Sequence, residues 1–172
     1  SNPIVAGYDI DSGKELWAVD CMYGEVGPSP AYGSGLIFAA NEYAKLVAID
    51  PADGYKIKWE DDEYLPEVAS PVVSNGLLFI ATSYGALICY DALTGDKQWE
   101  KEYNNGFYSS PIVVEGKLYA IDMDGVVHII KVDKSYKEIA SPKMNEEIVT
   151  TPAFADGRIY IRGKKYLYCI GK

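Results

Sequence analysis

Short apolar runs alternate with polar, glycine-bearing turns along the whole chain, and every run is of strand length. Four of these runs begin directly after a glycine, at Leu36, Leu77, Lys117 and Arg158. A tight turn and a second apolar run follow, as in residues 45–50, 87–91 and 127–131. Runs rich in β-branched and aromatic residues between turn residues are typical of strands, and no stretch carries the 3.6-residue apolar stripe of a helix. The pattern predicts an all-β protein.

The same pattern repeats with a period of about 40 residues. Four prolines, each preceded by serine or threonine, mark the period: Pro30, Pro71, Pro111 and Pro152. A glycine follows each proline five residues later. Each period holds four short antiparallel strands, a unit too thin to bury both of its faces alone. Radial stacking of such units gives a β-propeller, which is the fold we expect.

A second motif recurs at the turn before the fourth strand of each unit. It consists of an aspartate, a glycine four residues later, and then a tryptophan. Its members are Asp9, Gly13 and Trp17, then Asp50, Gly54 and Trp59, and then Asp91, Gly95 and Trp99. One indole can bury about 150–250 Å² of surface. We therefore expect these residues to dock each blade against the next.

The next segment departs from this motif. Lys131 stands in the place of the aspartate, Ser135 in that of the glycine and Ile139 in that of the tryptophan. Because isoleucine buries less area than an indole, we expect a looser outer turn in this blade and the weakest contact with the neighbouring blade.

Residues 91–99, behind the segments 70–73 and 76–79, resemble the PQQ-like β-propeller repeat, and the resemblance covers nearly the whole chain. The repeat is similar to that of quinoprotein dehydrogenases and also to that of non-catalytic propellers, such as the lipoprotein of the outer-membrane protein assembly machinery. For the dehydrogenases the resemblance implies PQQ held over a tryptophan and beneath two adjacent cysteines, with Ca²⁺ bound by acidic and amide side chains. Because Cys21, Cys89 and Cys169 are not adjacent, we expect this segment to bind neither PQQ nor calcium.

The repeats divide one propeller segment, residues 1–172, into about four blades. Whole blades are expected at 29–60, 70–101 and 110–140, with partial blades at 1–20 and 151–172. The resemblance implies a ring of seven or eight blades, of which this chain would form an arc. The alternative is a closed four-bladed ring, in which the Trp17 strand pairs with residues 166–170. The arc is favoured, since four blades would have to turn through about twice the angle per blade that eight require. Its open faces predict a protein partner or self-association.

The remaining polar motifs provide no catalytic, cofactor-binding or metal-binding residue. The segment 122–125 begins like a calcium loop, but apolar residues occupy the later ligand positions, so a hairpin turn explains it better. The acidic run 60–63 is typical of a solvated loop between blades, the alternatives being a cation site or a patch for a basic partner. His128 is the single histidine, so neither a His-rich metal centre nor a Ser-His-Asp triad with a spare base can be assembled. Lys164-Lys165 is too short a basic step for an anion site.

Charge and composition exclude several classes of binding partner. The chain has 16 basic and 25 acidic residues, a net charge of −9, so nucleic acid and anionic membrane surfaces are repelled. No apolar run approaches the roughly 20 residues of a transmembrane helix. Cys89 and Cys169 lie in apolar strand patterns, where a thiol is usually buried. The resemblance to exported propellers favours an extracytoplasmic location, either periplasmic or at the cell surface.

These observations favour a non-catalytic propeller that acts as a protein-interaction or scaffold module. The 15 tyrosines suit an interface, because their rings are amphipathic, although tyrosine is also common in strands. Two alternatives stay open: part of a quinoprotein, PQQ-dependent dehydrogenase, and a carbohydrate- or peptide-binding sensor module.

Overall fold

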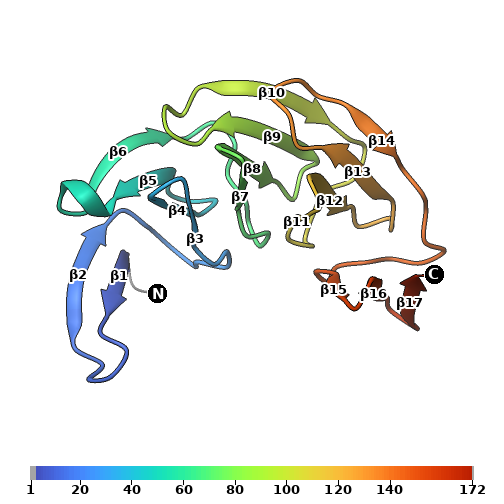
Figure 1. Cartoon of the computed structure of the whole chain (residues 1–172), viewed down its shortest axis with the longest axis horizontal. Helices are drawn as coiled ribbons and strands as arrows, with labels where there is room; N and C mark the ends of the chain where they lie inside the picture. Colours follow the sequence, from blue (N-terminus) through green and yellow to red (C-terminus); the bar gives the residue numbers. More distant parts are fainter. Residues whose placement is uncertain (1–2, 172) are drawn as a thin grey trace.

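The computed structural model describes residues 3–171, which form five successive antiparallel sheets. Figure 1 shows the sheets following one another around an open arc, with the first and last sheets at its two ends. The expected all-β propeller architecture is confirmed. No helix in the described part of the chain is both long and apolar enough to cross a membrane.

The strands fall into groups of two, four, four, four and three. The first group is β1 (Ile4–Tyr8) and β2 (Glu15–Asp20). The second is β3 (Ala31–Gly33), β4 (Leu36–Ala40), β5 (Leu46–Asp50) and β6 (Lys56–Asp61), with the 3-10 turn η1 (Pro51–Asp53) before β6. The third is β7 (Val72–Ser74), β8 (Leu77–Ala81), β9 (Ala86–Asp91) and β10 (Lys97–Glu102). The fourth is β11 (Ile112–Val114), β12 (Lys117–Ile121), β13 (Val127–Lys131) and β14 (Glu138–Ala140). The fifth is β15 (Ala153–Ala155), β16 (Arg158–Arg162) and β17 (Leu167–Gly171).

The recurring glycine after each proline lies in the hairpin that joins the first two strands of a sheet. In all four hairpins it follows a non-glycine residue with φ between 49° and 53°: Ser34, Asn75, Glu115 and Asp156. The glycines themselves also have positive φ. Two successive residues at positive φ are typical of a type I′ turn, whose twist matches that of the flanking strands.

The hydrophobic core lies between the sheets. The two largest clusters lie between the second and third sheets, around Phe38 and Ile80, and between the third and fourth, around Phe79 and Leu118. Every residue of β8 is therefore buried. The clusters at the two ends of the arc are smaller, with five buried side chains between the first and second sheets and four between the fourth and fifth.

A ladder of hydroxyl groups joins successive sheets at the residues that precede the repeated prolines. The amide of Ser29 donates to Ser70 Oγ at 2.9 Å, and the amide of Ser70 donates to Ser110 Oγ at 2.9 Å. The amide of Ser110 donates to Thr151 Oγ1 at 3.0 Å. Each bond spans one repeat, so the recurring hydroxyl residue connects neighbouring blades.

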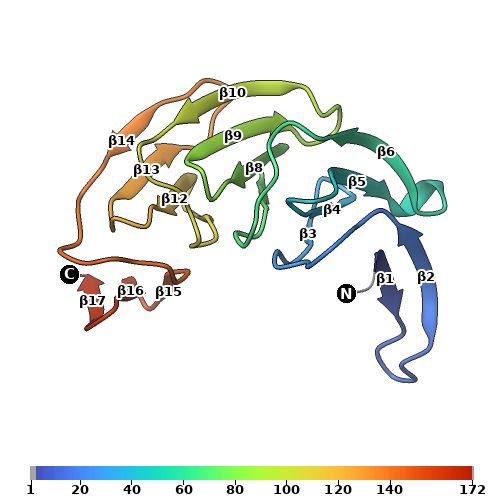
Figure 2. The same ribbon diagram turned by 180° about the vertical axis from the view of Figure 1, so that it is seen from behind.

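The arc does not close on itself within residues 3–171. Strands β2 and β17 belong to separate sheets, and Figure 2 shows the open side between them from behind. The pairing required for a closed four-bladed ring is therefore not the arrangement of this structure.

Candidate interaction surface

The three tryptophans lie against the sheet that follows their own. Trp59 Nε1 donates to the carbonyl oxygen of Ala92 at 3.0 Å, and Trp99 Nε1 donates to that of Asp133 at 3.0 Å. Trp17 has a stacking contact instead, with its ring centroid 4.4 Å from that of Tyr55. The indoles thus contact the turn between the third and fourth strands of the next blade.

The aspartates and glycines of the motif form that turn. Asp9 Oδ1 accepts from the amide of Ser12 at 2.8 Å, and Asp50 Oδ1 accepts from the amide of Ala52 at 2.9 Å. The glycines Gly13, Gly54 and Gly95 all have positive φ. Gly95 also makes room for the neighbouring indole, because a Cβ there would lie 2.8 Å from Trp59 Cδ2.

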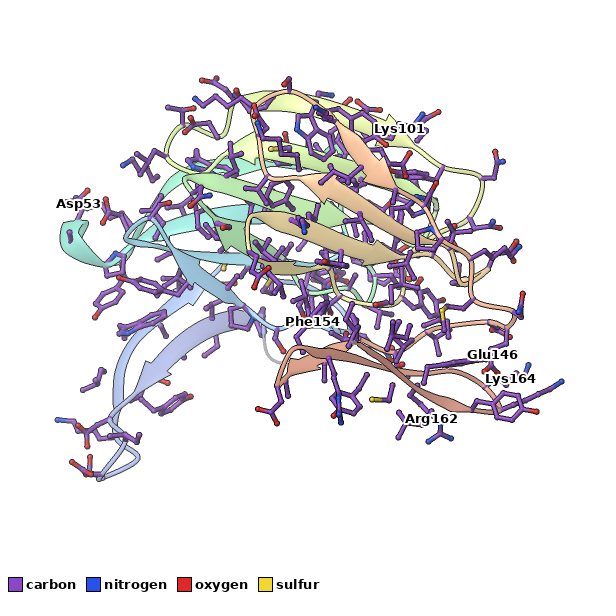
Figure 3. The ribbon with its side chains drawn as sticks, turned by 45° about the vertical axis from the view of Figure 1, so that its right-hand side comes forward. Asp53, Lys101, Glu146, Phe154, Arg162 and Lys164 are labelled. Carbon is purple, nitrogen blue, oxygen red and sulfur yellow. The ribbon has the colours of Figure 1, made fainter. Side chains whose placement is uncertain are left out.

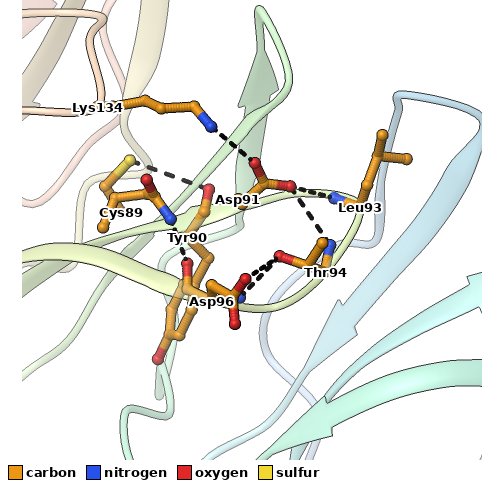
Figure 4. A network of polar contacts seen from close by, with 8 residues as sticks. Cys89, Tyr90, Asp91, Leu93, Thr94, Asp96 and Lys134 are labelled. Atoms are coloured by element: carbon orange, nitrogen blue, oxygen red, sulfur yellow. Dashed lines mark hydrogen bonds and ion pairs between the residues drawn. The ribbon is translucent and has the colours of Figure 1, made fainter.

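Asp91 connects two blades as well as closing its own turn (Figure 4). Its Oδ1 accepts from the amides of Leu93 and Thr94, at 3.0 and 3.3 Å. Its Oδ2 accepts from Lys134 Nζ of the next blade at 3.1 Å. The hydrogen bond from Lys134, followed by those from the turn amides, lowers the pKa of Asp91 below its usual value.

The turn expected to be loose has its own polar contacts. Asp133 Oδ1 accepts from the amide of Ser135 at 3.3 Å, and Asp133 Oδ2 pairs with Lys131 Nζ at 2.6 Å. Asp133 therefore supplies the carboxylate that position 131 lacks. Ile139 is 51% exposed and does not take the place of the docking indole. The sequence does contain a signal for this turn: Asp133 follows Lys131, the position that aligns with the repeated aspartate, by two residues.

His128 lies in a buried polar cluster that the sequence pattern did not reveal. It is 6% exposed; Nδ1 lies 3.0 Å from Glu138 Oε1 and Nε2 lies 3.2 Å from Asp122 Oδ2. The ring of Tyr103, from the preceding blade, packs against it at a tilt, with 4.0 Å between centroids. Asp122 also accepts from the amide of Val126 at 2.9 Å, as in a hairpin turn. The cluster joins β13, β14, the turn after β12 and the preceding blade, and its groups are engaged with one another.

The described residues do not fit a quinone cofactor or a metal ion. All three tryptophans are engaged in packing between sheets, so none offers an indole face beside paired cysteines. Within residues 3–171 no group of three or more His, Cys, Asp or Glu side chains is arranged so that it could hold a metal ion. Burial raises the pKa of the Cys89 thiol to about 12. The expectation that Cys169 is buried was wrong: it is exposed on β17, because the last sheet is covered by a neighbour on one face only.

An open cavity of about 360 Å³ lies beside the last sheet, lined by Glu147, Val149, Thr150, Arg162, Gly163 and Lys164. Figure 3 labels Arg162 and Lys164 in this region, together with Glu146. Lys164 Nζ pairs with Glu147 at 3.2 Å. Glu146 accepts from the amide of Lys165 at 2.6 Å. Of the basic step at 164–165, the side chain of Lys164 is thus paired with a carboxylate of the chain.

A surface of tyrosines and carboxylates is formed by four loops at one end of the blades. We call it the Glu–Tyr patch and define it as Glu25, Glu42, Tyr43, Glu67 and Tyr108. Tyr108 Oη donates to Glu67 Oε2 at 3.2 Å. The charge of Glu42, partial desolvation and the charges of Glu67 and Glu25 raise the pKa of Tyr43. The patch is acidic and carries aromatic rings.

Asn41 holds two of these loops in place. Its side chain is 1% exposed, and Nδ2 donates to the carbonyl oxygens of Tyr23 and Glu25, both at 2.8 Å. Its Oδ1 accepts from the amide of Tyr43 at 2.9 Å. A buried amide whose hydrogen bonds are satisfied makes a rigid support. The exposed side chains of the patch therefore extend from a fixed backbone.

The comparisons with known proteins agree with this architecture. A family model described as outer membrane protein assembly factor BamB matches residues 1–171. The chain belongs to this PQQ-like propeller family. Among solved structures it is similar to BamB from Moraxella catarrhalis, with 16% identity and a TM-score of 0.76 over 94% of this chain and 50% of that one. It is also similar to the computationally designed Ika8 protein, with 12% identity and a TM-score of 0.82 over 99% of this chain and 53% of that one. Sqt1 from Saccharomyces cerevisiae is similar as well, with 14% identity and a TM-score of 0.75 over 99% of this chain and 53% of that one. The chain spans about half the length of each of these three proteins, and the structural likeness shows the fold.

Proposed function

We propose that this chain is part of a propeller that binds another protein as a scaffold and performs no reaction of its own. The family described as an outer-membrane protein assembly factor supports a role in protein interaction. An extracytoplasmic location, as for an assembly factor of the outer membrane, is part of the proposal.

One observation carries the proposal: large aromatic side chains are exposed on loops whose backbone is fixed. Tyr23 is 72% exposed, Tyr43 is 64% exposed and Tyr84 is 59% exposed. Tyrosine gives a large amphipathic contact area with few rotatable bonds, which lowers the entropy lost on binding. Because adjacent strands are antiparallel, these loops lie at one end of the blades, and the turns that carry the docking motif lie at the other.

Site-specific photo-cross-linking tests this function in the cells that produce the protein. A benzophenone amino acid is placed at Tyr23 or Tyr84 and, as the control, at Leu93, which is 48% exposed at the opposite end of the blades. We expect discrete protein adducts from the two tyrosine positions and none from Leu93. Equal adducts from all three positions, or none from any, would contradict the proposal.

A second measurement tests the absence of a quinone reaction. A ligand that prefers the folded state raises the melting temperature. We expect no change in melting temperature with PQQ and Ca²⁺, and an appreciable rise would show that the protein binds the cofactor of a dehydrogenase.

A further inference from the structure

We infer that His128 is a pH-sensitive clamp on the outer strand of the fourth sheet. With a proton on both ring nitrogens it holds Glu138 of β14, and with a neutral ring it releases that carboxylate to water. The inference does not depend on the protein-binding function proposed above, because it concerns how the fourth sheet is held together.

His128 stands at a position that is apolar in the preceding blade. It lies opposite Ala120 on β12, as Ile88 lies opposite Ile80 on β8. Both Ile88 and His128 are buried, so a titratable ring occupies the layer between the third and fourth sheets. A buried polar group is normally hydrogen-bonded, and each nitrogen of this ring faces one carboxylate.

The two contacts of His128 require a proton on each nitrogen. Nδ1 lies 3.0 Å from Glu138 Oε1, and Nε2 lies 3.2 Å from Asp122 Oδ2. A carboxylate only accepts hydrogen bonds, and a neutral imidazole has a single N–H. A neutral ring would therefore leave one carboxylate facing a nitrogen lone pair, whereas the imidazolium donates to both carboxylates. The ring of Tyr103, at 4.0 Å between centroids, also favours the cation.

The other groups that face the ring keep their charge between about pH 5 and pH 9. Tyr103 Oη lies 3.0 Å from Tyr136 Oη, and Phe107 contacts the imidazole edge-on. Burial, followed by the hydrogen bond to Tyr136, raises the pKa of Tyr103, and burial raises the pKa of Tyr136. Lys101 Nζ lies 5.7 Å from the centroid of the Tyr103 ring and 6.0 Å from that of the Tyr136 ring, and a lysine ammonium keeps its charge over this range. The imidazole is therefore the group whose charge changes.

The two carboxylates differ in their access to water, and this difference decides which contact is lost. The side chain of Asp122 is 5% exposed, whereas that of Glu138 is 31% exposed. A buried carboxylate without a donor costs more free energy than a hydrated one. When Nδ1 gives its proton to water, the remaining Nε2–H therefore stays on Asp122, and Glu138 turns to the solvent.

The direction of the pH dependence follows from the number of protons bound. The imidazolium has two charged partners in the folded chain and loses both on unfolding, so folding favours the bound proton. The contribution to stability is therefore present at acidic pH. It is lost as the pH rises and the imidazole becomes neutral, a change that histidine undergoes near physiological pH.

The strand β14 is the element that the clamp controls. It has three residues, all exposed, whereas the outer strands β6 and β10 have six residues each. At the end beside Glu138, the amide of Lys131 on β13 donates to the carbonyl oxygen of Lys137 at 2.9 Å. A short strand with few buried contacts opens at a low free-energy cost. Loss of the Glu138 contact should therefore loosen this backbone hydrogen bond.

The protonation of the ring can be measured directly by NMR of the 15N-labelled chain. Because His128 is the single histidine, its ring nitrogens are identified without further assignment. We expect protons on both nitrogens at about pH 5 and on Nε2 alone at about pH 9. Any other pair of states, such as a proton on Nδ1 alone at the higher pH, would overturn the inference.

Hydrogen exchange of the Lys131 amide measures the hold on β14. After correction for the intrinsic rate, its protection should fall about tenfold from about pH 5 to about pH 9, because a hydrogen bond to a charged group is lost. The matched control is the amide of Asp91, which donates to the carbonyl oxygen of Asp96 at the same place in the third sheet. Ile88 takes the place of the histidine there, so protection should stay constant. A parallel fall at both amides would overturn the inference.

The variant Glu138→Gln tests whether the second proton is what matters. The side-chain amide of glutamine can donate to Nδ1 of a neutral ring, so protection of the Lys131 amide should become equal at the two pH values. Asp11→Asn, which removes one carboxylate at an exposed turn of the first sheet, should retain the fall of about tenfold expected for the parent chain. An undiminished fall in Glu138→Gln, or its loss in Asp11→Asn, would reject the clamp.

Discussion

Replacing Gly95 by alanine should destabilise the protein through the contact between two blades. Gly95 has φ of 79°, and placing an L residue in this left-handed region costs about 1–2 kcal/mol. The new Cβ would lie 2.8 Å from Trp59 Cδ2 and 3.0 Å from Trp59 Cε3, so the indole must move. Overpacking of this kind costs about 1–3 kcal/mol. We expect Gly95→Ala to lower the free energy of unfolding by about 2–5 kcal/mol.

Gly54→Ala separates these two contributions. Gly54 has φ of 66° at the equivalent turn, but a Cβ there would meet no atom within 4 Å. This variant should therefore lose only the backbone contribution of about 1–2 kcal/mol. Urea unfolding followed by circular dichroism measures both variants without relying on tryptophan emission. Equal losses for Gly54→Ala and Gly95→Ala would refute the packing argument, as would a Gly95→Ala loss that is undiminished when Trp59 is replaced by leucine.

Three further predictions concern other features of the blades. Ser110→Ala should lower the free energy of unfolding by about 1 kcal/mol, because the amide of Ser70 in the preceding blade loses its acceptor. Urea unfolding measures this loss. The control is Ser29→Ala, whose hydroxyl accepts no bond in the described structure, and an equal loss in that variant would contradict the prediction. Glu115→Asn should raise stability by about 0.5–1 kcal/mol, since asparagine suits the positive φ of a type I′ turn; a lower melting temperature would count against it. An aromatic disulfide reagent should label Cys169 in the folded protein, whereas Cys89, buried and with its pKa raised to about 12, should react only after unfolding; equal labelling rates would contradict this.

The fold could be predicted from the sequence because its repeat is regular. The hydroxyl-proline pairs and the glycines five residues later recur at nearly constant spacing, and each glycine lies in the expected hairpin. The spacing also indicates which residues meet between blades. Ser70 and Ser110 are one repeat apart and are joined by a hydrogen bond, as expected where residues one repeat apart become neighbours.

The same reasoning would have brought part of the patch together. Glu67 and Tyr108 are 41 residues apart and form a hydrogen bond, but their residue types differ, so no recurring motif marks them. The pairing of Lys134 with Asp91 was missed for a similar reason. Lys134 lies in the turn of the fourth sheet, where Asp133 takes the role of the repeated aspartate two positions late, so no recurring motif marks this turn. The exposure of Cys169 depends on whether a sheet has neighbours on both faces, and an apolar pattern along one strand does not contain that information.

The layers between sheets have unequal thickness, and this asymmetry sets the curvature of the molecule. At the inner strands, Gly33 approaches Val73 so closely that a Cβ would lie 2.6 Å from Val73 Cγ1. At the outer strands, the indole of Trp59 fills the space between the same two sheets. A thin inner edge and a thick outer edge make each layer a wedge, and the wedge angle determines how many blades complete a circle. Ring size is thus a property of side-chain volumes, which substitutions at the inner and outer strands can change in opposite directions.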